Sequence, residues 1–390
     1  MFPPLAYLQW IKGRPAAAEH DLGSSDLRRL AADDPDEPVP PRLRGLSPPT
    51  GDALLRERVA AEYKIDESNV LLTAGATHGG FLACATAAAL ARERGADAEA
   101  DGGDPADAVA PDDAGGPQPC ALVEKPGYEP LVETPRGLGS RVARFCRPEP
   151  TVALDPERVG AAAPDLAGPL AHVTVTNRHN PTGVLTDRET LAETAEATAQ
   201  HGGYLLVDEV YAPYTVGDGE AGTAFGGPTG AGLPATVTVG SLTKFHGLGG
   251  LRIGWITGPE AFVERARQVE QHVPALAAPS VALARRFFAH RDDLVADARD
   301  HCRRNHDLLA SFLDARADLD GVVHPGSPFA YLEHERTDGD AMSAAAWDAG
   351  VLVVPGRFFG MDDGVRVSLG RAPAECEAAL AAFGRVLDDL

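Results

Sequence analysis

Residues 236–256, TVTVGSLTKFHGLGGLRIGWI, combine a short strand pattern with a lysine, a glycine-rich turn and an arginine. Val237 and Val239 alternate with threonines, which is the period of a half-buried strand. A polar bend leads to Lys244, and the apolar segment after the turn carries Arg252. The stretch therefore predicts a strand end that brings an amine and a guanidinium to one turn.

Lysine is scarce in this chain, which makes Lys244 conspicuous. Only four of the 35 basic residues are lysines. Arginine does not lose its proton in proteins, so a lysine kept in an apolar, glycine-rich segment indicates a need for an amine. Burial lowers the pKa of such an amine, and a neutral amine can form a Schiff base with an aldehyde. The alternative is a strand-end lysine whose ammonium group reaches solvent.

Length, composition and charge limit the classes of function. The 390 residues, 44% of them hydrophobic, suffice for two domains with sizeable cores. A net charge of −22 argues against nucleic-acid binding, which needs a basic face. Acidic residues spread along the whole chain, with few lysines, favour a cytoplasmic protein of a halophile. An ordinary acidic cytosolic protein is the alternative.

The five cysteines show no CxxC spacing and lie in apolar surroundings. An odd number in such settings predicts buried, reduced thiols rather than disulfides or a zinc site. The first 15 residues lack the apolar run and cleavage site of a signal peptide, and no segment approaches the roughly 18 apolar residues of a membrane span. We therefore expect a cytoplasmic protein that contacts no membrane.

Short apolar strands alternate with helical segments through the first two thirds of the chain. This pattern predicts an α/β fold with a mostly parallel, seven-stranded sheet covered on both faces. Ligands of such sheets bind beyond the carboxyl ends of the strands. Polar residues that could carry chemistry, among them Asn180, Asp208 and Lys244, follow the expected strands at these ends. The expected strands are residues 70–73, 120–125, 141–146, 171–176, 204–209, 236–240 and 252–256.

The first of these strands is followed by a small-residue turn and a helix that starts near Thr77 and runs to about residue 94. The free N–H groups and dipole of a helix N-terminus attract a phosphate, although many such turns bind nothing.

The expected domain organisation has three parts. Residues 1–30 form an arm that packs with the small domain, residues 31–260 form the large domain, and residues 261–390 form a small α+β domain. Residues 95–119 are acidic and of low complexity, which predicts a solvated loop without chemistry. In the small domain we expect helices over 259–272, 279–317 and 373–387 and strands over 329–334, 351–355 and 365–369.

Taken together, five motifs resemble those of fold-type I pyridoxal-phosphate enzymes, specifically the class I/II aminotransferases. They occur in family order, with 28 residues from Asn180 to Asp208, 36 from Asp208 to Lys244 and 8 from Lys244 to Arg252. The resemblance covers nearly the whole chain except the acidic insertion. The motifs are TNRHNPTG at 176–183, VDEVY at 207–211, SLTK at 241–244, GLRIG at 250–254 and RVS at 366–368.

The resemblance implies a role for each of these residues toward pyridoxal 5′-phosphate. Lys244 would hold the cofactor as a Schiff base and then carry a proton between substrate and cofactor. Asp208 would pair with the pyridine nitrogen; a helix cap is its alternative. Tyr211 and Asn180 would donate to the 3-hydroxyl oxygen. Tyr128 would stack on the ring, although a tyrosine there is often simple packing.

The same resemblance implies a phosphate site and a substrate site. Ala76, Thr77, Ser241 and Arg252 would hold the phosphate. Arg366, with Asn180, would bind the substrate α-carboxylate; the alternative for Arg366 is a surface arginine on a strand.

Two departures from the family pattern concern the substrate end. Leu46 stands where the family often has a tyrosine that reaches the partner subunit's phosphate. No second arginine for a dicarboxylate substrate is evident, and we expect Arg178, His179 and His78 to be structural or solvent-facing.

The implied activity is transfer of an amino group from an α-amino acid to a 2-oxo acid, by a ping-pong mechanism in a homodimer. A lyase or cyclising enzyme with the same cofactor is the alternative, since the motifs do not separate the two. A cofactor-binding regulatory module is a remote third hypothesis. The identities of donor and acceptor stay open.

Overall fold

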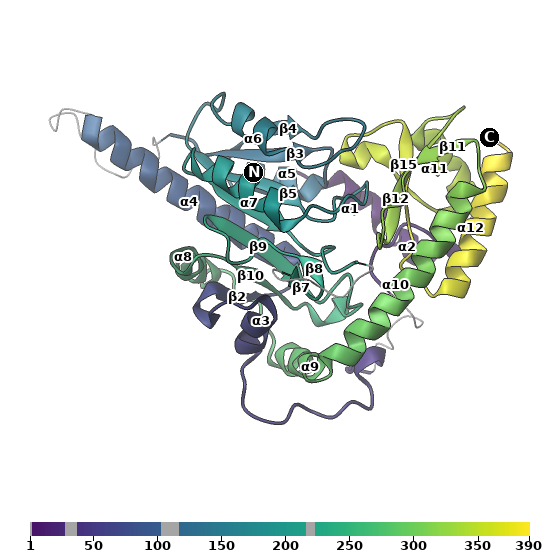
Figure 1. Cartoon of the computed structure of the whole chain (residues 1–390), viewed down its shortest axis with the longest axis horizontal. Helices are drawn as coiled ribbons and strands as arrows, with labels where there is room; N and C mark the ends of the chain where they lie inside the picture. Colours follow the sequence, from purple (N-terminus) through teal and green to yellow (C-terminus); the bar gives the residue numbers. More distant parts are fainter. Residues whose placement is uncertain (1, 28–36, 103–116, 216–222) are drawn as a thin grey trace.

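The computed structural model describes residues 2–27, 37–102, 117–215 and 223–390. A seven-stranded sheet forms the centre of a large α/β part, with a smaller α+β part beside it (Figure 1). The strand order is β2-β10-β9-β6-β5-β3-β4, and only β10 runs antiparallel to its neighbours. The predicted α/β class and sheet are confirmed. The strands are β2 (Val70–Thr73), β3 (Cys120–Lys125), β4 (Arg141–Cys146), β5 (Leu170–Thr176), β6 (Tyr204–Asp208), β9 (Thr236–Ser241) and β10 (Gly254–Thr257).

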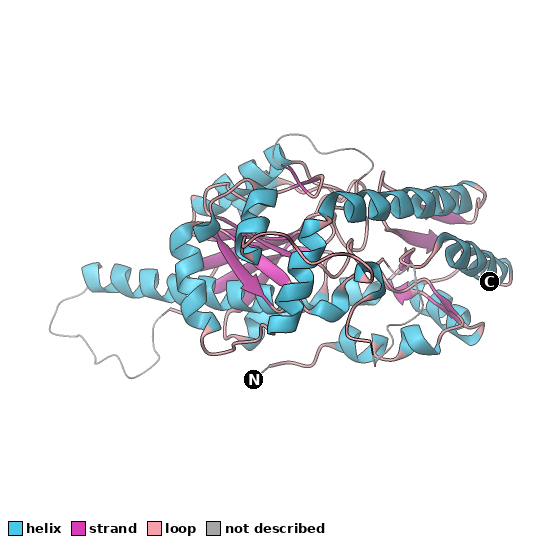
Figure 2. Cartoon of the chain, turned by 90° about the horizontal axis from the view of Figure 1, so that it is seen from below, coloured by secondary structure: helices cyan, strands magenta, loops and turns pink. Residues whose placement is uncertain are grey.

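Helices cover both faces of this sheet (Figure 2). On β6, Leu206 packs into the core formed with α4 and α8, whereas Leu205 and Val207 pack on the other side with α6 and α7. Successive strand residues point to opposite faces, so burial on both faces requires continuous apolar runs. The helices around the sheet are α3 (Leu55–Tyr63), α4 (Ala76–Gly102), α5 (Glu129–Gly137), α6 (Pro156–Ala162), α7 (Arg188–Ala199) and α8 (Glu260–Glu270).

Helix α4 is longer than the sequence suggested. It continues to Gly102, past the expected end near residue 94, because alanines alternate through the acidic segment and favour a helix. Residues 95–102 are therefore helical, not part of a loop. Residues 103–116 of the expected loop lie outside the described residues.

The single helix expected over 279–317 is two helices, α9 (Ala278–Ala289) and α10 (Arg291–Asp314), which meet at His290. No glycine or proline marks this break, so periodicity alone does not reveal it. Helix α9 packs beside α3, on the core that also contains Trp255 of β10.

The smaller part is a four-stranded sheet with helices α10, α11 (Gly339–Asp348) and α12 (Pro373–Asp388). The strand expected over 351–355 divides because its halves pair with different partners. Val351 and Leu352 (β13) pair in parallel with the N-terminal β1, and β14 pairs with β15. The remaining bounds are α1 (Ala6–Ile11), α2 (Arg14–Ala17), β1 (His20–Asp21), β7 (Thr223–Ala224), β8 (Gly227–Pro228), β11 (Leu319–Gly321), β12 (Phe329–His334), β13 (Val351–Leu352), β14 (Val354–Pro355) and β15 (Gly364–Ser368).

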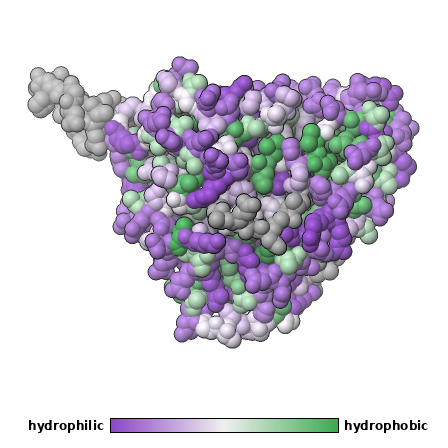
Figure 3. Space-filling view, in the orientation of Figure 1, coloured by the Kyte–Doolittle hydropathy of each residue, from purple (hydrophilic) through white to green (hydrophobic). Residues whose placement is uncertain are grey.

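All five cysteines are free thiols, as predicted, and four of them are buried: Cys84, Cys120, Cys302 and Cys376. The prediction is wrong for Cys146, which is exposed because it ends β4, the edge strand of the large sheet. Hydrophilic side chains predominate on the face in Figure 3. Among the described helices, none combines the length and hydropathy that a membrane crossing needs.

Candidate active site

One edge of the large sheet collects the polar residues that the sequence singled out. The parallel strands β5, β6 and β9 end there at Thr176, Asp208 and Ser241. Strand β10 runs the opposite way and starts at Gly254, which pairs with Ser241, so the preceding Arg252 reaches the same edge. A cavity of about 270 Å³ lies at this edge. All ten predicted site residues line it: Ala76, Thr77, Tyr128, Asn180, Asp208, Tyr211, Ser241, Lys244, Arg252 and Arg366.

Asp208 faces this cavity from the end of β6. One carboxylate oxygen accepts a hydrogen bond from Val210 N at 3.2 Å. Burial raises the pKa of Asp208 to about 6, although the Val210 N–H and the nearby Lys244 lower it. The protein thus keeps an acid in a place where its negative charge is only partly compensated, which suits a cationic ligand.

Lys244 lies three residues beyond the end of β9. Its Nζ donates to Ser25 Oγ at 3.2 Å and lies 5.5 Å from the centre of the Tyr211 ring. The sequence suggested a lowered pKa. Burial does lower the pKa of Lys244, but Tyr211, Asp26 and Tyr7 together outweigh burial, so the pKa is raised. That expectation was wrong because it considered burial without the neighbouring phenols and carboxylate.

Arg366 projects from β15 of the smaller sheet to the same cavity and is almost fully buried. Its two terminal nitrogens donate to Asn180 Oδ1 at 2.9 Å and to Gly23 O at 2.8 Å. Its Nε has no hydrogen-bond partner among the described residues. Because arginine only donates, the bond fixes the oxygen of the Asn180 amide toward Arg366 and leaves its Nδ2 available as a donor.

The part of the cavity lined by the start of α4, Ser241 and Arg252 is rich in donors. Ala76 and Thr77 begin α4, so their N–H groups lie in the first helical turn and have no partner within the helix. Arg252 Nη2 donates to Ala74 O at 3.2 Å and packs on Gly75, where a side chain would come within 2.9 Å of it. Gly75 has a φ of +83°, so glycine suits this turn on both counts. The Ser241 hydroxyl also lines this cavity.

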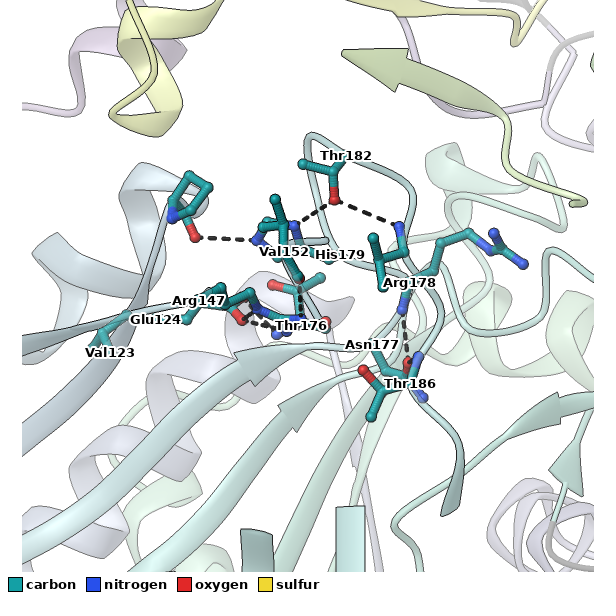
Figure 4. A network of polar contacts seen from close by, with 12 residues as sticks. Val123, Glu124, Arg147, Val152, Thr176, Asn177, Arg178, His179, Thr182 and Thr186 are labelled. Carbon is teal, nitrogen blue, oxygen red and sulfur yellow. Dashed lines mark hydrogen bonds and ion pairs between the residues drawn. The ribbon is translucent and has the colours of Figure 1, made fainter. Parts of the chain in front are cut away.

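A buried polar network supports the loop that carries Asn180 (Figure 4). Glu124 Oε2 accepts two hydrogen bonds from Arg147, at 2.6 and 2.8 Å, and Glu124 Oε1 accepts one from Thr176 N at 2.7 Å. His179 bonds to Thr182 Oγ1 and Pro126 O, and burial holds the pKa of His179 well below its ordinary value. Every ion pair and hydrogen bond named here joins two groups of the protein. The network therefore holds the loop in place rather than binding a ligand.

Arg178 and His78, which were expected to be structural or solvent-facing, bind other groups of the protein. Arg178 donates to Gly183 O and Pro325 O, and burial lowers its pKa to about 9. His78 Nδ1 accepts from Ala74 N at the start of α4. Neither residue lines the cavity.

Two residues that contact the predicted site residues, Tyr7 and Ser25, were not predicted from the sequence. Tyr7 of the N-terminal α1 lines the cavity and meets Tyr128 edge to face at a centroid distance of 5.7 Å. Ser25 bonds to both Lys244 and Tyr211. The sequence predicted only an arm over residues 1–30 that packs with the small domain, because nothing local shows which residues such an arm will contact. Leu46 packs against the core of its own chain.

Comparison with known proteins agrees with this geometry. The family model described as aminotransferase class I and II matches residues 106–383. The chain is 32% identical over 254 residues to the probable aspartate/prephenate aminotransferase of Thermus aquaticus, which covers 62% of each protein. It is 28% identical over 277 residues to capreomycidine synthase of Streptomyces vinaceus, covering 68% of each.

A solved structure extends the likeness in fold to almost the whole chain. Thermus thermophilus aspartate aminotransferase with maleate aligns with a TM-score of 0.74 over 99% of this chain and 97% of that one, at 21% identity. Since the family model covers well over half of the sequence, the assignment does not depend on this distant structural likeness. The chain belongs to the class I and II aminotransferases, a family of fold-type I enzymes that use pyridoxal 5′-phosphate.

Proposed function

We propose that this protein is a pyridoxal-phosphate-dependent aminotransferase that moves an amino group from an α-amino acid to a 2-oxo acid. The observation that carries the proposal is the convergence of Lys244, Asp208 and Arg366 on one cavity. Asp208 ends β6, Lys244 follows the end of β9, and Arg366 lies on β15 of the smaller sheet. Each has the chemistry that one part of the reaction needs.

The donor set fits the cofactor. Asp208 supplies a carboxylate for a protonated pyridine nitrogen, and the raised pKa of Asp208 falls when a cation binds beside it. The first turn of α4, Ser241 and Arg252 supply donors for a phosphate. Tyr211 and the Asn180 amide supply donors for a phenolic oxygen. When bound, pyridoxal phosphate withdraws electrons from the carbon that loses its proton.

The residues of the chain provide the remaining steps. Arg366 binds the α-carboxylate with the guanidinium N–H groups that Asn180 and Gly23 leave unused, since each Nη carries two donors and makes one of these bonds. This orients the Cα–H bond of the substrate near the Lys244 amine. Lys244 accepts the proton from Cα and later delivers it, which requires a base tethered within reach of both sites. The aromatic walls from Tyr7 and Tyr128 help to exclude water.

We propose further that the protein is a cytoplasmic homodimer adapted to concentrated salt. Large apolar side chains are exposed on neighbouring elements, at Leu54 before α3 and at Val273 and Leu276 before α9. Such exposure favours a covered surface in the assembly. The net charge of −22 supports a strongly hydrated surface. Light scattering measures the mass of the assembly, and thermal unfolding at high and low salt measures its stability. A monomer would contradict the homodimer, and an unfolding temperature that does not fall in dilute buffer would contradict the adaptation to salt.

The alternative activity is a lyase or cyclising reaction, which the likeness to capreomycidine synthase keeps open. A single-round experiment separates the two. Protein loaded with pyridoxal phosphate is mixed with individual amino acids, and 2-oxo acid and ammonia are measured. An aminotransferase releases one equivalent of 2-oxo acid per site and needs an acceptor to continue. Continuous ammonia release without an acceptor would overturn the proposal in favour of the alternative.

A further inference from the structure

The segment 21–27 lies beside the active site, where Gly23 O and Ser25 Oγ contact Arg366 and Lys244, and is held at both ends. Asp21 Oδ1 accepts hydrogen bonds from Gly23 N and Ser24 N, and Asp21 Oδ2 accepts from Arg371. At the other end, Leu27 N donates to Lys244 O at 3.0 Å. Leu22 O also accepts a hydrogen bond from Ser368 N of β15 at 2.7 Å, so the segment connects the smaller sheet to the backbone of Lys244.

Ser25 occupies the middle of this segment, with 3% of its surface exposed. Its carbonyl accepts a hydrogen bond from Tyr214 OH at 3.0 Å, which fixes the backbone. Its hydroxyl lies 2.6 Å from Tyr211 OH and 3.2 Å from Lys244 Nζ. One small hydroxyl thus contacts both the amine and the phenol on which the proposed reaction depends.

Hydrogen-bond polarity determines what this hydroxyl can do. A lysine ammonium only donates, so Ser25 Oγ accepts from charged Lys244 and can donate to Tyr211. A neutral amine has a lone pair, so after Lys244 loses a proton Ser25 can donate to it and accept from Tyr211. When Lys244 gives up its proton, both hydrogen bonds of Ser25 can therefore reverse direction. Ser25 and Tyr211 each keep a proton throughout.

We propose that Ser25 is a positioning residue that orients the Lys244 amine and stabilises its charged form through the Ser25–Tyr211 hydrogen bond. A serine with a purely structural role would form hydrogen bonds through its hydroxyl without changing the pKa of the Lys244 amine. The inference rests on the proposed function for its catalytic meaning, but the hydrogen bond can be tested in the protein without cofactor.

The scarcity of lysine makes a direct measurement possible. Protein labelled with ¹³C at lysine Cε gives four side-chain signals in NMR, from Lys12, Lys64, Lys125 and Lys244, and a Lys244→Arg variant assigns the last. Other groups that face Lys244 are Tyr211, Tyr7, Asp26, Arg366 and Asp208, and they are unchanged in the variants below.

In Ser25→Ala we expect the pKa of Lys244 to fall by about one unit, because the ammonium loses a hydrogen-bond acceptor. Ser25→Thr, which keeps the hydroxyl, should restore it, and the neighbouring Ser24→Ala is the matched control and should leave it unchanged. If Ser25→Ala does not fold, Ser25→Cys has nearly the same volume and a weak acceptor, and should give a smaller fall. A Lys244 titration that is the same in the wild type and Ser25→Ala or Ser25→Cys overturns the proposal, as does an equal shift in Ser24→Ala.

With cofactor bound, Ser25→Ala should slow the first round with an amino acid about tenfold while the KM stays within about threefold, because Arg366 still binds the carboxylate. A raised KM with an unchanged rate contradicts the positioning role. If the protein takes up no pyridoxal phosphate, the proposed function fails, whereas the titration of the cofactor-free protein still decides the role of Ser25.

Discussion

Arg147 and Arg366 are buried to nearly the same extent but end in opposite electrostatic surroundings. Arg147, 3% exposed, meets the Glu124 carboxylate at 2.6 Å in the network behind the active site. Arg366, 1% exposed, meets an amide oxygen and a carbonyl, and no ion pair of Arg366 occurs within the described part of the chain. The first region is closed by its own charges, whereas the second leaves a charge available to a ligand.

This difference separates stability from function. Removing one member of a closed buried pair leaves an uncompensated charge, which costs stability. Removing a group from the open region takes away a charge that the folded protein had not neutralised. We therefore expect variants of the cavity to lose activity while the fold is kept, and variants of the network to lose the fold.

The largest effect is expected at Lys244 in the open region. Lys244→Ala removes the base tethered beside the substrate, so turnover should fall by about 10⁴-fold or more. The unfolding midpoint of the cofactor-free protein should change little. Turnover near that of the wild type in the steady-state assay would contradict the proposed mechanism.

The closed region gives the next largest effect. Glu124→Gln leaves Arg147 buried without its anion and should lower the free energy of unfolding by about 3–5 kcal/mol. Chemical denaturation measures this change. As a control, Glu67→Gln breaks a surface pair with Arg56, in which Glu67 is 49% exposed, and should cost less than about 1 kcal/mol. Similar losses in both variants would remove the distinction between the two regions.

Asp208→Asn should stabilise the cofactor-free protein. The pKa of Asp208 is raised to about 6 from an ordinary value of 3.8, so its ionised form costs stability above pH 6 and not below pH 4. The two-unit difference corresponds to about 3 kcal/mol. The variant should gain up to that amount at pH 7.5 and less at pH 5, and should bind the cofactor about 10- to 100-fold more weakly. A variant less stable than the wild type at pH 7.5 would show that the buried Asp208 carboxylate does not destabilise the cofactor-free protein.

Arg366→Gln should raise the KM for the amino acid about 100-fold, because a charge-assisted contact to the carboxylate is lost. The free energy of unfolding should stay within about 1 kcal/mol of the wild type, in contrast to Glu124→Gln. Steady-state kinetics and denaturation on the same sample measure both quantities. A large loss of stability without a change in KM would show that Arg366 belongs with the closed region.

The sequence predicted the sheet, and that Asn180, Asp208 and Lys244 lie at one edge of it, for a physical reason: parallel strands end at the same edge. The roles of these residues toward a cofactor came from the family motifs and stay predictions. The sequence predicted the bounds of helices and strands less well where tertiary contacts determine them. The break at His290 and the division of the strand around Val353 depend on which partner each half packs against.

The same limit applies to the N-terminal arm. Tyr7 lines the cavity and Ser25 contacts Lys244 because the arm is held by distant segments, including β13, which pairs with β1 some 330 residues away in the chain. Burial lowers the pKa of Lys244, and its net rise depends on Tyr211 together with two groups of this arm, Asp26 and Tyr7. Neither pairing nor electrostatics of this kind is encoded in a local pattern.

We expect the Lys244 amine to hold the aldehyde of the cofactor in a cavity with Asp208. Borohydride reduction of protein loaded with pyridoxal phosphate, followed by peptide mass mapping, tests it directly, because only four lysines compete. We predict one pyridoxyl group per chain, on Lys244, and none at this stoichiometry in Lys244→Ala. Label distributed over Lys12, Lys64 and Lys125, with Lys244 unmodified, would contradict the account.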